Sequence, residues 1–161
     1  MKNHTSASPV TQEKKVYIFI DEFIDVNEAE IGIKAVELLE YLGYEVVHLE
    51  HKESGRAAFS KGFLEQGRNI ARHNVEVFSA ILTEPNAVIL GVEPSAILSF
   101  RDEYPEILRG KEREQALQLA TRAWTVEEFL SDEIRTNQIS SASFDGIERT
   151  MAVHLHCHFK A

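Results

Sequence analysis

The end of the chain carries the densest group of side chains able to bind a metal. Three histidines occupy alternate positions from His154 to His158, and Cys157 lies between the last two. In an extended strand the histidines share one face and Cys157 points the other way. The first and third histidines are then roughly 13 Å apart, too far for one ion, so His154 is interpreted as a packed side chain. The candidate ligands, in a pattern that suits zinc or another borderline metal, are His156, Cys157 and His158.

A second candidate site follows the apolar residues 87–90, where the chain reads Gly-Val-Glu-Pro-Ser over residues 91–95. Pro94 is preset for the first position of a helix, and Glu93 or Ser95 can accept the free amide hydrogens there. Amides and the helix dipole at such a turn favour an anion or a carboxylate-like group. A capped turn without any ligand has the same sequence pattern, so both interpretations stay open.

The spacing of apolar residues predicts an α/β fold. Runs rich in β-branched residues predict strands over residues 16–20, 44–49, 87–90 and 150–159. Helical spacing predicts helices over about 27–42, 60–82, 94–104, 112–124 and 126–134. Short β-α-β connections require parallel strands with right-handed crossovers. We therefore expect a mostly parallel sheet of about four strands, in the order 2-1-3-4, with helices on both faces.

Such a sheet brings the candidate residues together, because the carboxyl ends of parallel strands meet at one edge. We expect that edge to gather Asp21 with Glu22, the loop 51–56, the turn 93–95, and Cys157 with His158.

Composition restricts the classes of partner. With 161 residues and 43% hydrophobic residues, we expect a disordered lead-in over 1–15 and one domain over 16–161. A net charge of −9 argues against nucleic acid and anionic membrane surfaces as partners. The sequence has neither a membrane-length apolar run nor the order of a signal peptide, so we expect a cytoplasmic location. A single cysteine excludes a complete iron–sulfur cluster held by this chain's thiolates alone.

Two segments near Glu93 resemble a known family. Residues 91–96, Gly-Val-Glu-Pro-Ser-Ala, and residues 100–105, Phe-Arg-Asp-Glu-Tyr-Pro, resemble the cysteine-rich CCG domain of iron–sulfur oxidoreductases. That family includes iron–sulfur subunits of glycolate and lactate oxidation systems and C-terminal parts of FAD-linked dehydrogenases. The resemblance runs from residue 17 to residue 161. It implies a Rossmann-like first repeat followed by the start of a second repeat.

Most cysteines of the family pattern are missing. Where members carry Cys-Cys-Gly-Arg, this chain reads Glu-Ser-Gly-Arg over residues 53–56, and Ala96 replaces the cysteine after Glu-Pro-Ser. The His-Cys-His run at 156–158 resembles the opening of the second half, so Cys157 alone inherits the role of a cluster ligand. The chain looks like a truncated member. We expect no cofactor in the isolated chain, and an iron–sulfur cluster only with further cysteines downstream.

The resemblance implies a component of FAD-linked glycolate- or lactate-type 2-hydroxyacid dehydrogenases, with a role in electron transfer and with FAD on a partner domain or subunit. Besides Cys157, the implied cofactor-binding residues are Gly55, Arg56, Glu93, Pro94 and Ser95. Arg56 beside a helix start would suit an anionic substrate group or a flavin phosphate.

Other interpretations stay open. The chain could be a degenerate, non-enzymatic docking or scaffold domain, or a small His/Cys metal-binding domain. Partners could also bring it to the periphery of a membrane. The apolar residues of the predicted terminal strand, Val153 and Leu155, favour self-association through that strand.

Overall fold

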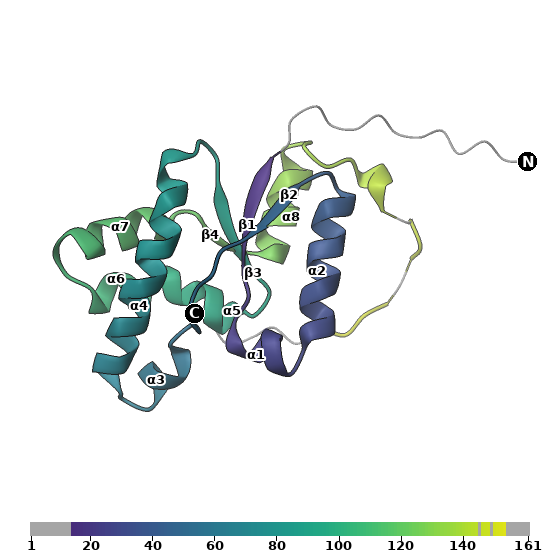
Figure 1. Cartoon of the computed structure of the whole chain (residues 1–161). Coiled ribbons are helices and arrows are strands. Elements are labelled where there is room, and N and C mark those ends of the chain that lie inside the picture. Colours follow the sequence, from purple (N-terminus) through teal and green to yellow (C-terminus); the bar gives the residue numbers. More distant parts are fainter. Residues whose placement is uncertain (1–13, 145, 149, 154–161) are drawn as a thin grey trace, which may run out of the picture.

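Four short parallel strands form the centre of the computed structural model, which describes residues 14–144, 146–148 and 150–153 (Figure 1). β1 (Lys15–Phe19) pairs with β2 (Glu45–His48) on one side and with β3 (Val88–Gly91) on the other. β4 (Ala123–Thr125) pairs with β3. The order β2-β1-β3-β4 confirms the predicted parallel α/β sheet.

Helices cover both faces of the sheet, as predicted. Alternate residues of β1 enter two separate cores: Tyr17 and Phe19 enter one, and Val16 and Ile18 enter the other. The first core is closed by α4 (Leu64–Phe78), α6 (Glu103–Ile107) and α7 (Gly110–Ala120). The second core is closed by α2 (Ala29–Tyr41) and α8 (Val126–Arg135). Figure 1 shows these helices on opposite sides of the strands.

Short helices fill the connections between these larger elements. They are α1 (Glu22–Val26), α3 (Arg56–Ser60), η1 (Ser79–Thr83), α5 (Pro94–Ile97), η2 (Leu98–Phe100) and η3 (Ser141–Ser143). α1, α3 and α5 follow the carboxyl ends of β1, β2 and β3, so their first turns lie at one edge of the sheet. None of the helices in the described ranges is long and apolar enough to cross a membrane.

Several predicted boundaries are wrong. The single helix predicted over 60–82 is divided into α4 and η1 and is separated from α3 by Gly62, whose φ of +76° ends a helix. The helix that begins at Pro94 finishes before Tyr104, at Phe100, but Tyr104 and Pro105 lie in the first turn of a further helix, α6, where proline is tolerated. Lys15, assigned to the lead-in from sequence, is the first residue of β1.

The fourth strand is not the one predicted. Trp124, assigned to the end of a helix, lies in β4, because Ile89 donates a main-chain hydrogen bond to the Arg122 carbonyl and draws the segment into the sheet. Pairing with β3 therefore overrides the helical pattern. Residues 150–153 of the predicted terminal strand form no strand, and Met151 and Val153 are exposed. Residues 154–159, with the predicted pairing of Leu155, lie outside the described structure.

Candidate functional site

A pocket of about 380 Å³ opens at the carboxyl edge of the sheet, and we call it the edge pocket. Its walls come from the end of β1, the loop after β2, the start of α3 and the turn after β3. The lining residues are Asp21, Glu22, Phe23, Ser54, Arg56, Ala57, Ser60, Glu93, Ser95 and Ala96. The predicted convergence is thus confirmed for the described segments, whereas Cys157 and His158 lie outside the described residues.

Two buried side chains fasten the loop that carries Ser54. Asn74 accepts a hydrogen bond from the Lys52 amide at 2.9 Å and donates one to the Glu53 carbonyl at 2.9 Å. The Tyr104 hydroxyl donates to the Ser54 carbonyl at 2.9 Å and accepts from Asn74 at 3.0 Å. Burial raises the pKa of Tyr104 well above its usual range, so its proton stays available for this bond. The loop is therefore held through its main chain.

Ser54 is fully buried and tied to the first turn of α1. Its amide and its hydroxyl each donate a 2.8 Å hydrogen bond to the Glu22 carboxylate, and its hydroxyl accepts one from the Arg56 amide at 3.1 Å. Gly55 follows with φ +75°, a conformation that only glycine adopts readily, and caps α3. The hydroxyl of Ser54 thus joins the loop after β2 to α1 and α3.

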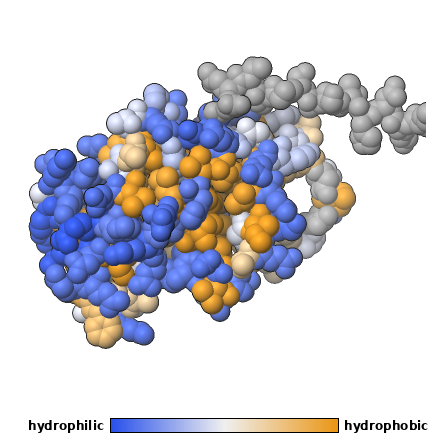
Figure 2. Space-filling model, in the orientation of Figure 1, coloured by the Kyte–Doolittle hydropathy of each residue, from blue (hydrophilic) through white to orange (hydrophobic). Residues whose placement is uncertain are grey.

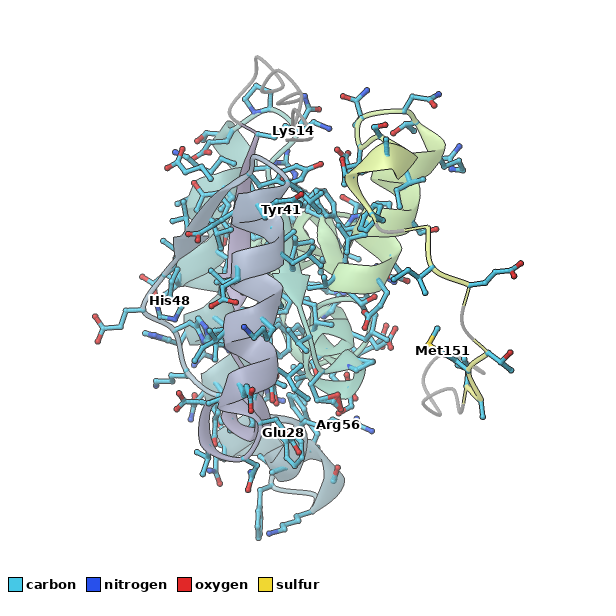
Figure 3. The ribbon with its side chains drawn as sticks, turned by 90° about the vertical axis from the view of Figure 1, so that its right-hand side faces the viewer. Lys14, Glu28, Tyr41, His48, Arg56 and Met151 are labelled. Atoms are coloured by element: carbon cyan, nitrogen blue, oxygen red, sulfur yellow. The ribbon has the colours of Figure 1, made fainter. Side chains whose placement is uncertain are left out.

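Arg56 forms an ion pair with Glu103 across the pocket wall, from α3 to α6. Their side chains are 34% and 22% exposed. The guanidinium predicted to suit an anion or a flavin phosphate is therefore engaged by a carboxylate of the chain itself. Figure 3 places Arg56 at the lower end of the molecule, below His48 of β2.

The turn after β3 is capped as its sequence indicates. The Glu93 carboxylate accepts hydrogen bonds from the Ser95 amide at 3.2 and 3.3 Å and from the Ser95 hydroxyl. Pro94 occupies the first turn of α5. A carboxylate of the chain thus takes the amide position at which an anion or a carboxylate-like group was considered, and α5 has only four residues.

Asp21 is the most unusual residue of the pocket. It is 1% exposed and caps α1, because its Oδ1 accepts hydrogen bonds from the Phe23 amide at 2.9 Å and the Ile24 amide at 3.2 Å. Its Oδ2 is buried and finds no hydrogen-bond partner in the described structure. Burial raises the pKa of Asp21, and the neighbouring Glu22 and Glu93 charges add to this, whereas the two capping bonds oppose it.

His51, in the same loop as Ser54, does not line the pocket, and its ring stacks on Phe19 with the centroids 4.4 Å apart. Its Nε2 accepts from the Ile20 amide at 3.3 Å, so Nδ1 carries the proton and donates to the Lys52 carbonyl at 2.8 Å. Burial lowers the pKa of His51, in agreement with a neutral ring. Both nitrogens are engaged within the chain, which gives this histidine a structural role.

The described walls do not suit an iron–sulfur cluster. Ser54 offers a hydroxyl that is already bonded to Glu22, and Ala96 offers only a methyl group. Soft thiolates are the ligands that such clusters require. Within the described ranges, no three His, Cys, Asp or Glu side chains are arranged to hold a metal ion. The predicted metal ligands His156, Cys157 and His158 lie outside those ranges.

Sequence reasoning missed the two residues that fasten the loop. Asn74 interrupts the apolar stripe of α4 formed by Ile70, Ala71 and Phe78, and all four side chains are buried. A polar residue within such a stripe indicates a buried hydrogen-bonding role, and this signal was available in the sequence. Tyr104 gave no comparable signal, because a tyrosine fits an apolar stripe equally well.

These features define an α/β domain with a polar pocket at the carboxyl edge of its sheet. The sequence is similar to D-2-hydroxyglutarate dehydrogenase of Haemophilus influenzae, with 26% identity over 153 residues, 95% of this chain and 14% of that protein. Lactate utilization protein A of Macrococcus caseolyticus is 28% identical over 147 residues, 89% of this chain and 56% of that protein. D-2-hydroxyglutarate dehydrogenase of Escherichia coli is 27% identical over 133 residues, 83% of this chain and 13% of that protein.

No family model matches the chain, and no solved structure matches it. The chain spans about half the length of lactate utilization protein A and a small part of the dehydrogenases. Its relatives therefore connect it to oxidoreductase systems at low sequence identity.

Proposed function

We propose that the chain is the CCG-domain component of an FAD-linked dehydrogenase system for 2-hydroxy acids, with a role in electron transfer. One observation carries the proposal: the names of the relatives refer to lactate and to 2-hydroxyglutarate, which are both 2-hydroxy acids, and the similarity covers 83–95% of the chain. Oxidation of a 2-hydroxy acid to a 2-oxo acid releases two electrons and two protons, which a flavin on the partner accepts. This chain then belongs to the electron-accepting side.

In this proposal, the thiolates of an iron–sulfur cluster come from outside the edge pocket. Cys157 is the only cysteine in the sequence, so it contributes one ligand and other polypeptide contributes the rest. The partner then lies next to the part of the chain that contains the implied cofactor-binding residues, which are Gly55, Arg56 and the turn 93–95.

A second candidate is a docking or scaffold domain without a cofactor of its own. The state of Ser54 favours it, because this side chain is fully buried and hydrogen-bonded to Glu22. The polar groups of Ser54 are thus satisfied within the chain, without a metal centre.

Anaerobic reconstitution separates the two candidates. The 161-residue chain is compared with a fusion to the remaining part of lactate utilization protein A from Macrococcus caseolyticus, by iron content, sulfide content and visible absorbance. Electron transfer through Cys157 predicts that Cys157→Ser lowers the iron content of the fusion, whereas the control Leu117→Ser, at an exposed leucine of α7, leaves it unchanged.

An unchanged cluster in the Cys157→Ser fusion would remove Cys157 from the ligand set and favour the docking role. A sulfide-containing product from monomers of the 161-residue chain alone would contradict both candidates.

A further inference from the structure

α1 and α2 leave an apolar groove on the surface, of about 390 Å³, which we call the α1–α2 groove. It is lined by Ile20, Ile24, Asp25, Ala29, Gly32, Ile33, Val36 and Glu37. Figure 2 shows separate hydrophobic residues among hydrophilic ones at the positions of α1 and α2. In Figure 3, α2 runs across the front from Glu28 to Tyr41, and Met151 lies to one side of it.

α2 is apolar on more than the face that it turns toward the sheet. Leu39 is fully buried in the core, and Ala29, Ile33 and Val36 form a stripe at i, i+4 and i+7 along the groove, of which Val36 also packs against that core. Ile33 in the groove is 57% exposed, and Val26, the last residue of α1, is 76% exposed. A concentration of exposed aliphatic side chains of this kind marks an interaction surface.

Gly32 determines the depth of the groove. A Cβ atom at this position would lie 2.7 Å from Cγ2 of Ile24, so the absence of a side chain lets α1 pack closely against α2. Glycine in the interior of a helix costs up to about 1 kcal/mol relative to alanine. The chain accepts this cost where it brings the two helices together.

The acidic residues around the groove favour an occupant with positive charge. Residues 22–41 contain six acidic residues and one basic residue, and one of the six, Glu22, lines the edge pocket instead. Asp25 and Glu37 belong to the groove itself, and the one lysine, Lys34, pairs with Glu37 at 2.7 Å. A second copy of the chain would bring one acidic groove against another, which like-charge repulsion opposes. A basic occupant gains from the same field.

The backbone that lines the groove favours a helix over a strand as the occupant. The groove is lined by two helices, whose main-chain groups are bonded internally and offer no row of free donors and acceptors to an added strand. The occupant must satisfy its own backbone, as a helix does. Apolar anchors at i, i+3, i+4 and i+7 of such a helix would lie along the stripe of α2.

We propose that the α1–α2 groove is a docking site for an amphipathic helix of a protein partner, with an aliphatic stripe on one face and lysine or arginine along its flanks. The site is independent of the proposed electron-transfer role, because none of its residues lines the edge pocket.

The test is a fluorescence anisotropy titration of the full 161-residue chain with a synthetic helical peptide of about five turns. The peptide carries leucines at i, i+3, i+4 and i+7 and lysines on both flanks. Ile33→Ser should weaken binding about tenfold, because it removes a central apolar anchor. The matched control Leu117→Ser, an exposed leucine on α7, should bind as the original chain does. Circular dichroism of both variants confirms that they are folded.

Three results would overturn the proposal. The first is equal binding of a peptide with the same composition in scrambled order, which would show attraction by charge alone. The second is unchanged binding by Ile33→Ser. The third is a dimer of the free chain in analytical ultracentrifugation that Ile33→Ser dissociates, which would make a second copy the occupant.

Discussion

Replacing Asp21 by asparagine should stabilise the fold at neutral pH. Oδ1 of Asp21 caps α1, whereas Oδ2 is buried without a partner beside the charges of Glu22 and Glu93. Asparagine keeps the capping oxygen and is an equally good N-cap. It removes a buried charge and leaves a neutral amide group in the place of Oδ2, and an unpaired buried group costs about 1–3 kcal/mol when neutral and more when charged. Because the charged cap also gains from the dipole of α1 by up to about 1 kcal/mol, we expect Asp21→Asn to raise the free energy of unfolding by about 1 kcal/mol.

The difference in stability between the two proteins should depend on pH, because the pKa of Asp21 is raised in the folded state. Burial raises the pKa of Asp21 in the folded protein above the ordinary value of 3.8, so the folded state binds this proton more tightly than the unfolded chain does. Between the two pKa values, the contribution of Asp21 to stability is therefore lost as the pH rises. Asp21→Asn does not titrate at this position. Its advantage should be complete above the folded pKa and should shrink as the pH falls toward 3.8.

Urea denaturation followed by circular dichroism, repeated from neutral to mildly acidic pH, measures the difference between the two proteins. Asp25→Asn is the matched control, because Asp25 lies in the same short helix but is exposed. Its effect should stay within about 0.5 kcal/mol. A loss of stability in Asp21→Asn at neutral pH, or a gain that is the same at every pH, would refute the reasoning.

Two further substitutions test packing and ion pairing away from Asp21, both by thermal denaturation. Arg101 donates to both carboxylate oxygens of Glu128, at 3.0 and 2.7 Å, and to the Ala123 carbonyl at 2.7 Å. Burial opposes ionisation of Glu128, but the bonds from Arg101 and the cap outweigh it and hold the pKa of Glu128 below its usual value. Arg101→Ala should therefore destabilise the fold by about 1–2 kcal/mol, and Arg101→Lys should retain only part of the stability that Arg101 provides. Equal stability of Arg101→Ala and the original chain would contradict this prediction. Gly32→Ala should destabilise the fold by about 1 kcal/mol despite the better helix propensity of alanine, because its Cβ would lie 2.7 Å from Cγ2 of Ile24. Ile24→Val in the same chain should restore part of this loss. A Gly32→Ala protein that is more stable than the original chain would show that α1 moves away freely.

The sequence was most informative where local chemistry and tertiary structure agree. The apolar run 87–90, ended by Gly91 and followed by Glu93 and Pro94, predicted a central strand leading into a capped helix, and β3 and α5 have this arrangement. The helix predicted over 126–134 is α8, which begins at Val126 with a capping box formed by Thr125 and Glu128. Strong strands and capped helices determine a parallel sheet, and a parallel sheet places its carboxyl ends together whatever their side chains are.

The sequence was least informative where long-range contacts decide. β4 is three residues long, and its main-chain pairing with β3 selects a strand where Trp124 continues a helical pattern. Tyr104 and Asn74 meet the loop before Ser54 only after the chain has folded, because 30 residues separate Tyr104 from Asn74 and 50 separate it from Ser54. No local pattern specifies such a meeting.

The fastening of this loop also explains how the edge pocket can keep its shape while its chemistry changes. Asn74 and Tyr104 bond the main-chain groups of the loop, and Gly55 ends it in a left-handed conformation, so most of the bonds that fasten the backbone do not involve the side chain at position 54. The side chain does depend on its surroundings: the Ser54 hydroxyl donates to Glu22 and accepts from the Arg56 amide. A thiol donates and accepts hydrogen bonds weakly, so cysteine at this position would lose much of that network and leave the Glu22 carboxylate less well satisfied. Serine is therefore bonded into the wall through its hydroxyl, and a thiolate in its place would also be repelled by the Glu22 carboxylate, which lies 2.8 Å from the hydroxyl oxygen.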